Sequence, residues 1–227
     1  MHLVDTSIII CNYNYGRFIS RAIRSCLHQT ENDSLEVIVI DDASTDNSME
    51  VLGNFKDRIK VVSLPQNKGV AYCSNLGIRK ADGMFVMRVD ADDFIHQKTV
   101  EVLKMHLCMN PDYAFAYSDH VRVSDFDDTR ERIHLDTVET LKNHGAGVLF
   151  KKSCLEAVGL YDEEMRNCED YLLIERLIQE GYHGIHVQLP LYKYYRHHAN
   201  MTNDQHSRKE WEKIAKEKAN ESRPTFN

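Results

Sequence analysis

Three carboxylates crowd into four positions of the chain, at Asp90, Asp92 and Asp93, directly behind the apolar run 84–87. An apolar run that stops at a charged cluster predicts a buried strand reaching the edge of a sheet. Adjacent carboxylates repel one another unless a cation lies between them. Mg²⁺ and Mn²⁺ prefer carboxylate oxygens and keep coordination sites for substrate phosphates. The triplet is therefore either a solvated acidic turn or a metal site, and alone it does not decide between them.

A second pair of acids, Glu169 and Asp170, begins the amphipathic segment 169–180, which predicts a helix. Acids in the first turn of a helix are favoured by the helix dipole, by roughly 0.3–1 kcal/mol. Alternatively, one of them is a general base held at the mouth of a ligand site. Spacing alone does not choose between these interpretations.

Polar residues also follow other apolar runs. Asp41 and Asp42 come after a predicted strand, where carboxylates can accept hydrogen bonds from a nucleobase or a ribose. Gly69 stands at a loop-to-helix junction, where glycine lets a ligand approach closely. Near the end of the chain, Arg196 has the geometry to bind a diphosphate, and His198 is a candidate Mn²⁺ ligand.

The elements that must position these residues alternate apolar strands with amphipathic helices in the first half, which predicts a parallel α/β sheet. We expect strands at 7–11, 36–40, 59–64 and 84–89 and helices at 17–29 and 69–80, with a further helix after residue 40 capped near Ser44 or Asp46. Ligands of such sheets lie across the carboxyl ends of the strands. The polar clusters are therefore expected to converge on one crevice.

The second half departs from this alternation. The expected elements are a helix at 98–109, a strand at 113–123, a mobile loop region at 124–143, a short strand at 148–150, a helix at 169–180 and late strands interrupted by Pro190. Without a linker rich in Pro, Gly or Ser, residues 1–204 are predicted to form one domain, and 205–227 a charged helical tail docked by Trp211. The tail's narrow apolar stripe leaves peripheral membrane association as an alternative.

Composition excludes several classes of protein. The 227 residues carry a formal net charge of −7, which argues against a nonspecific nucleic-acid binder. No apolar stretch approaches the ~18 residues that cross a bilayer, and no signal peptide is visible. The six cysteines form no C-x-x-C pair and suit a reducing compartment. We expect a cytoplasmic protein that works in solution or at the inner face of the membrane.

Together these motifs resemble the family 2 glycosyltransferases with the GT-A fold, over nearly all of residues 5–204. The stretches that carry the resemblance are Tyr13-Asn14, Asp41 to Ser48, Asn67 to Gly77, Asp90 to Asp93, Glu169 to Tyr182 and Tyr195 to Thr202. The resemblance implies a single Rossmann-like α/β domain with a mostly parallel central sheet flanked by helices. This chain departs from the family pattern at Cys11-Asn12, often Pro-Thr, and at Ser74, often Arg, which leaves the donor nucleotide open.

The resemblance also implies roles for individual residues. Tyr13 would border the base, and Asp42, with Asp41 as a second candidate, would hydrogen-bond it. Asp90 would contact the ribose or a metal-bound water. Asp92 would coordinate Mn²⁺ or Mg²⁺ with Asp93 nearby, His198 would be a late ligand of the same metal, and Asp170 would be the catalytic base. The other substrate-binding residues implied are Asn14, Asn67, Gly69, Asn75, Glu169 and Arg196.

The implied activity is inverting, metal-dependent transfer of a sugar from a nucleoside diphosphate, UDP foremost, to a hydroxyl of a saccharide or lipid-linked acceptor in polysaccharide or glycoconjugate biosynthesis. One alternative is a sugar-phosphate nucleotidyltransferase, but such enzymes open with a glycine-rich loop, and segment 12–16 has a single Gly. The other is a non-catalytic nucleotide-sugar-binding module of the same fold. The acceptor, the linkage and the oligomeric state stay open.

Overall fold

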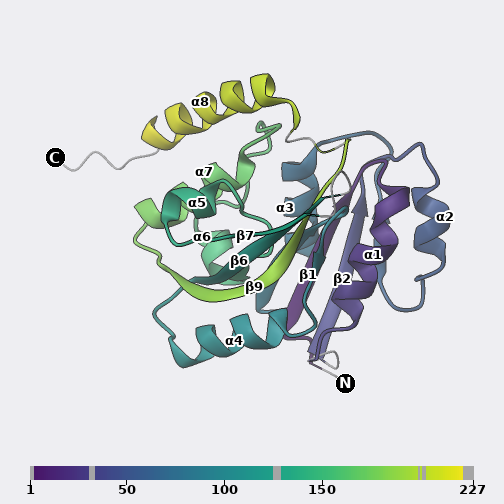
Figure 1. The fold of residues 1–227 in the computed structure, drawn as a ribbon, viewed down its shortest axis with the longest axis horizontal. Helices are drawn as coiled ribbons and strands as arrows, with labels where there is room; N and C mark the ends of the chain where they lie inside the picture. The colour runs from purple at the N-terminus through teal and green to yellow at the C-terminus, as the bar shows by residue number, and fades with distance from the viewer. Residues whose placement is uncertain (1–2, 31–33, 125–128, 199, 201–202, 222–227) are drawn as a thin grey trace.

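The computed structural model describes residues 3–30, 34–124, 129–198, 200 and 203–221. Within these ranges nine strands form one sheet in the order β3-β2-β1-β4-β8-β6-β9-β5, with β7 paired to the side of β6. Helices cover both faces of the sheet, and the last helix lies across the top of the molecule (Figure 1).

The first half of the sheet is parallel throughout. Strand β1 (Thr6–Asn12) pairs with β2 (Leu35–Asp41) and with β4 (Phe85–Asp90), and β3 (Lys60–Ser63) continues the sheet beyond β2. The connecting helices are α1 (Gly16–Leu27), α2 (Ser48–Gly53) and α3 (Val70–Lys80). These predicted elements are confirmed to within a few residues. The N-cap of α2 is Asn47, next to Asp46, whose carboxylate accepts the backbone N–H of Ser48 at 2.9 Å.

The second half is mixed. Its elements are β5 (Phe94–Ile95), α4 (Thr99–Met109), β6 (Phe115–Ser124), β8 (Leu149–Lys151), α6 (Lys152–Ala157), α7 (Glu169–Gln179), β9 (Gly184–Arg196) and α8 (Gln205–Glu221). Strand β8 runs antiparallel to β4 and β6, whereas β9 runs parallel to β6 and antiparallel to β5. The predicted α/β fold with flanking helices and a C-terminal helix is confirmed, with its parallel pairs concentrated in the first half.

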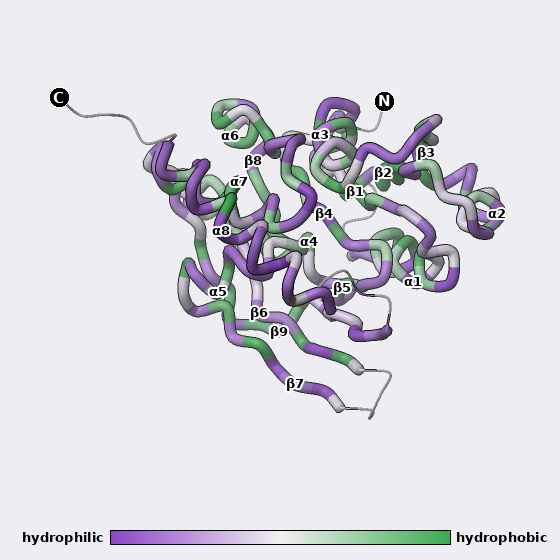
Figure 2. The backbone as a smooth tube through the Cα atoms, turned by 90° about the horizontal axis from the view of Figure 1, so that it is seen from above, coloured by the Kyte–Doolittle hydropathy of each residue, from purple (hydrophilic) through white to green (hydrophobic). Residues whose placement is uncertain are grey.

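Region 124–143, expected as a loop, contains two elements. Strand β7 (Arg130–Ile133) pairs antiparallel with β6, and α5 (Val138–Lys142) begins at a capping box formed by Thr137 and Thr140. Three of the four β7 residues are exposed, so the strand shows no alternation of apolar residues. Residues 125–128 lie outside the described ranges. In Figure 2, β7 and the ends of β6 and β9 project away from the main body of the molecule.

The predicted interruption at Pro190 is also wrong, because β9 is one continuous strand through that residue. Pro190 lies opposite Asp119 of β6, where the register of the two strands shifts. Proline has no N–H to donate to a ladder, and a bulge is a place where a strand tolerates that loss.

Two apolar clusters hold the helices to the two faces of the sheet. Because successive strand residues point to opposite faces, Ile8 and Ile10 pack with α1, α2 and α4, whereas Ile9 packs with α3, α6 and α7. A third cluster joins α8 to α7, with Trp211, Ile214, Ala215 and Ala219 against Met165, Tyr171 and Leu172. Among the described helices, none is long and apolar enough to span a membrane.

Two helical glycines give a matched test of this packing. A Cβ on Gly77 would lie 2.5 Å from Cγ2 of Ile9, which is buried in the sheet. Gly53 has open space around it. We expect Gly77→Ala to lower the free energy of unfolding by about 1–3 kcal/mol through overpacking. Gly53→Ala should leave it unchanged or raise it by up to about 1 kcal/mol. Urea unfolding measures both, and equal effects would contradict the packing described.

Candidate active site

A cavity of about 970 Å³ lies at the carboxyl ends of β1, β2 and β4, facing the start of α7. This volume suits a small-molecule substrate. The strand-end clusters predicted to converge do line it, as do residues from β6, α5 and α8. The predicted site residues in its wall are Tyr13, Asp42, Asn67, Gly69, Asp90, Asp92, Asp93, Glu169, Asp170 and Arg196.

Asp90 and Asp93 occupy different environments. The Asp93 carboxylate is 1% exposed and accepts hydrogen bonds from the Tyr192 hydroxyl and the Tyr195 N–H, both at 2.7 Å. Burial, and then the neighbouring Asp92 charge, raise the pKa of Asp93 well above its usual range. The Asp90 side chain is 37% exposed, and burial raises its pKa to about 6. Asp93 therefore anchors the loop to β9, and Asp90 is open to a ligand.

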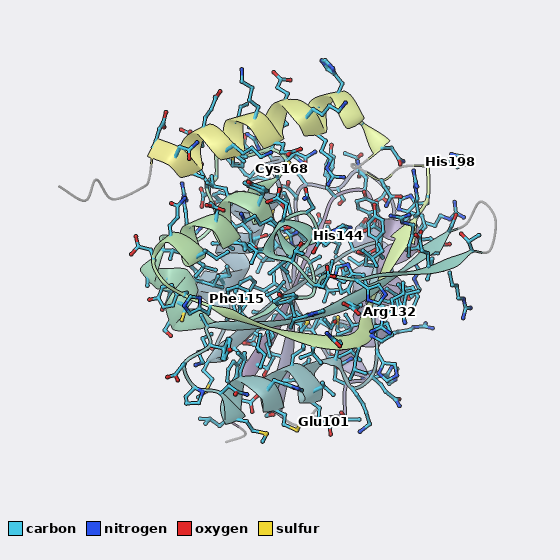
Figure 3. All side chains as sticks on the ribbon, turned by 60° about the vertical axis from the view of Figure 1, so that its left-hand side comes forward. Glu101, Phe115, Arg132, His144, Cys168 and His198 are labelled. Carbon is cyan, nitrogen blue, oxygen red and sulfur yellow. The ribbon has the colours of Figure 1, made fainter. Side chains whose placement is uncertain are left out.

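The histidine that the structure places beside Asp92 is His197, whereas the sequence analysis named His198 as the late metal ligand. His197 stacks on Phe18 with ring centroids 4.2 Å apart, and its Nε2 lies 2.9 Å from Asp92 Oδ2. The same oxygen accepts a 2.9 Å hydrogen bond from Asn200. His198 is exposed and lies at the edge of the molecule (Figure 3).

Asp92 and His197 would supply one oxygen and one nitrogen ligand to a metal ion bound here. Among the described residues no group of three or more His, Cys, Asp or Glu side chains could hold a metal alone. Mg²⁺ commonly binds through one or two carboxylates together with substrate phosphates, without an all-protein cage. The donor set fits a metal shared with a phosphorylated substrate.

Arg88 is a site residue that the sequence analysis missed. Its guanidinium is 7% exposed and contacts three carboxylates: Glu169 at 2.7 Å, Asp170 at 2.5 Å and Asp90 at 3.4 Å. A detectable signal existed, because Arg88 interrupts a buried strand two residues before Asp90 and therefore shares its face. A buried arginine requires carboxylate partners.

Asp170 lies at the first turn of α7 beside this guanidinium. The Tyr161 hydroxyl donates to its Oδ1 at 3.1 Å. Burial raises the pKa of Asp170 to about 7, although the Arg88 charge opposes the rise. Gly145, also missed, packs so closely that a Cβ there would lie 2.3 Å from Asp170 Cβ. A carboxyl with a pKa near neutrality can take up a proton in catalysis.

On the opposite rim, Asp42 holds a loop with its carboxylate. Its two oxygens accept the backbone N–H groups of Lys68 at 2.6 Å and Gly69 at 2.8 Å. Gly69 has φ +89°, a conformation that favours glycine. Tyr13 is 45% exposed and lines the cavity next to this loop. This rim offers an aromatic face and polar backbone to a planar ring.

Three predicted substrate-binding residues are not among those that line the cavity: Asp41 and Asn75 are buried, and Asn14 is exposed. Asn14 accepts hydrogen bonds from the loop after β2, at 2.7 and 3.2 Å. Asp41 accepts from the Asn12 amide at 2.8 Å. Asn75 clamps the backbone of Tyr161 with two bonds of 2.9 Å. These side chains hold the loops that carry the site.

The sequence of this chain is similar to those of known glycosyltransferases. Residues 7–159 match the model of glycosyl transferase family 2. An uncharacterized glycosyltransferase of Haemophilus influenzae is 38% identical over 124 residues, 51% of this chain and 49% of that protein. A chondroitin synthase of Pasteurella multocida is 33% identical over 121 residues, 52% of this chain and 12% of that protein. The chain thus spans about half the length of the first relative and less of the second.

Solved structures share the fold. S. aureus TarS 1-349 in complex with UDP-GlcNAc aligns with a TM-score of 0.76 at 19% identity, covering 88% of this chain and 61% of that one. The mannosyltransferase PcManGT from Pyrobaculum calidifontis, in complex with GDP-Man and Mn²⁺, gives 0.67 at 18% identity, covering 85% and 57%. With a family model that matches most of its length and the GT-A architecture, this chain belongs to glycosyl transferase family 2.

Proposed function

We propose that the chain transfers a sugar from a nucleoside-diphosphate donor, UDP foremost, to an acceptor hydroxyl with inversion at the sugar carbon. The observation that carries the proposal is one cavity that joins the open acidic edge at Asp90 and Asp92 to the buried carboxyl of Asp170. Structures of the related fold with UDP-GlcNAc support a UDP-sugar donor, and the one with GDP-Man and Mn²⁺ supports a metal. Saccharide or lipid-linked hydroxyls are the acceptors we propose.

On the donor side, Tyr13 borders the base and Asp90 reaches the ribose. Asp92 and His197 would hold a divalent ion, which when bound supplies Lewis-acid stabilisation of the departing diphosphate. Arg196, exposed on the cavity rim, adds a positive charge that suits the same group. These residues bind and orient the donor with its leaving group toward β4.

On the acceptor side, Asp170 removes the proton from the attacking hydroxyl, which displaces the diphosphate from the opposite face of the sugar. Arg88 and Tyr161 fix the orientation of its carboxylate. The closeness of Gly145 leaves no room for movement on that side. One displacement with one base accounts for inversion and requires no covalent intermediate.

The nucleotidyltransferase alternative receives no support from the turn after β1. Gly16, its one glycine, is packed so that a Cβ would lie 2.2 Å from the Asn47 amide oxygen. This glycine serves the contact with the start of α2 and does not form a phosphate cradle. A non-catalytic binding module of the same fold would bind a donor without turning it over.

The base assignment has a direct test. We expect Asp170→Asn to lower kcat by about 10²–10⁴, because one positioned base is lost, with UDP affinity unchanged. In the wild type, kcat/KM should fall as the pH drops through about 7, since Asp170 must be ionised to act. The exposed Asp112→Asn is the control and should keep full activity. Near-normal turnover in Asp170→Asn would exclude this base.

Arg88 should set the pH at which that base works. The Arg88 charge opposes the raised pKa of Asp170, and Arg88→Met removes that charge. The acidic limb of the kcat/KM profile should therefore shift to a higher pH than in the wild type. The same variant should lower the free energy of unfolding by about 3–5 kcal/mol, because buried carboxylates lose their partner. Arg88→Lys keeps a charge and should show smaller changes in both measurements. An unshifted limb in Arg88→Met would contradict the coupling.

Adjacent histidines provide a matched test of the metal ligand. UDP with Mn²⁺ should raise the Tm of the wild type more than UDP alone, because a ligand that binds only the folded state stabilises it. His197→Gln should abolish the Mn²⁺-dependent part, whereas His198→Gln should retain it. The reverse pattern would restore the assignment made from the sequence. Measurable donor hydrolysis with Mn²⁺ would exclude the non-catalytic module.

A further inference from the structure

The cavity has a basic wall opposite its acidic strand ends. This wall consists of Lys142 at the end of α5, Arg166 before α7, and Arg208 and Lys209 at the start of α8. The acid that these elements add to the cavity lining is Glu212, which pairs with Lys216 at 2.6 Å. In a chain of net charge −7, such a concentration of positive charge around one opening requires an explanation.

The guanidinium groups of this wall are not neutralised by carboxylates. Arg208 donates to the Asn143 side-chain oxygen at 3.1 Å, and Arg166 donates to the backbone oxygen of Lys68 at 2.6 Å. Across the part of the chain that the structure describes, neither of them forms an ion pair, and nor does Lys209. Arg88 contrasts with them, since three carboxylates surround it. Lys142 differs, because it pairs with Glu175 and Glu139. Arg166, Arg208 and Lys209 are therefore the members of the basic wall that keep positive charge available to a ligand.

The basic wall extends from the Gly69 loop, which Arg166 contacts, to the proposed base. Gly145 follows Lys142 by three residues and contacts Asp170. Cys168, two residues before Asp170, donates its thiol to the Arg208 backbone oxygen at 3.7 Å. Figure 3 shows His144 and Cys168 below α8, toward the middle of the molecule. An acceptor whose reacting hydroxyl lies at Asp170 would therefore place the rest of its structure beside the basic wall.

A buried imidazole adds a polar group to the same lining. His120 is 3% exposed, and burial lowers its pKa to about 3, so the ring is neutral. Its Nδ1 has no hydrogen-bond partner among the described residues. The basic wall thus lies beside a buried, neutral imidazole.

We propose that the basic wall binds an acceptor that carries an anionic group, a phosphate or a carboxylate, beside the hydroxyl that receives the sugar. The inference rests on the proposed transferase function, because Asp170 marks where that hydroxyl lies. Arginine binds phosphate and carboxylate groups through paired hydrogen bonds. Both kinds of group occur in polymers that are rich in hydroxyls. The acceptor class is thus an acidic saccharide or a polyol phosphate.

The test is calorimetric binding of three oligomers of similar length, with and without saturating UDP and Mn²⁺: a poly(ribitol phosphate), a chondroitin and a neutral chitin oligomer. At least one anionic oligomer should bind ten-fold or more tightly than the neutral one, and more weakly as salt rises. Whichever anionic oligomer binds identifies phosphate or carboxylate. If neither binds more tightly than the chitin oligomer, the proposal is wrong.

Variants assign the preference to the wall. Arg208→Gln with Lys209→Gln should weaken anionic binding at least ten-fold and leave UDP affinity and Tm unchanged, and Arg208→Lys should retain most of it. Lys213→Gln is the control, because Lys213 is 79% exposed and outside the cavity lining. Loss of UDP affinity in the double variant would assign these charges to the donor and overturn the proposal. Failure of UDP to bind the wild type counts against the transferase function, and the measurements without UDP still decide the acceptor.

Discussion

The buried guanidinium of Arg88 is the interaction on which the geometry of the site depends. Removing an arginine from water is costly, and the cost is offset only when its carboxylate partners stand at the right distance. Glu169 and Asp170 lie 81 and 82 residues further along the chain, so this one contact fixes the start of α7 against β4. Asp90 shares the same guanidinium. A single charged cluster therefore sets the separation between the proposed donor-binding edge at Asp90 and the proposed base.

Around this cluster, polar side chains divide into those that hold loops and those that face the cavity. Asn75 clamps Tyr161, whose hydroxyl in turn meets Asp170. Asp42 gathers the loop that contains Gly69. Such side chain–backbone bonds position a site without contributing to its chemistry. Side chain–backbone hydrogen bonds hold the loops of the site in place. Other side chains, which line the cavity, are left to contact the ligand.

Much of the architecture could be predicted because it follows local rules. Buried runs such as 36–40 and amphipathic runs such as 17–29 each carry their own periodicity, and the strands and helices formed where that periodicity placed them. Strand β7 and helix α5 were missed because their exposed residues leave no apolar pattern. The predicted interruption at Pro190 was wrong because β9 tolerates a proline there, at a shift in its register with β6. These errors arise where a neighbour in space overrides the local signal.

The α/β class, the family resemblance and the acids at strand and helix ends could all be identified from the amino-acid sequence, since they depend on residue type and short spacing. The contact between His197 and Asp92, across 105 residues, became visible only in the folded chain. So did the ion pairs of Arg88 with Glu169 and Asp170, and the presence in the cavity lining of Arg166 and Arg208, which form no ion pair within the described ranges. The reason is physical: pKa values, ion pairs and ligand geometry depend on distances of a few ångströms between remote segments, and packing of the whole chain sets those distances.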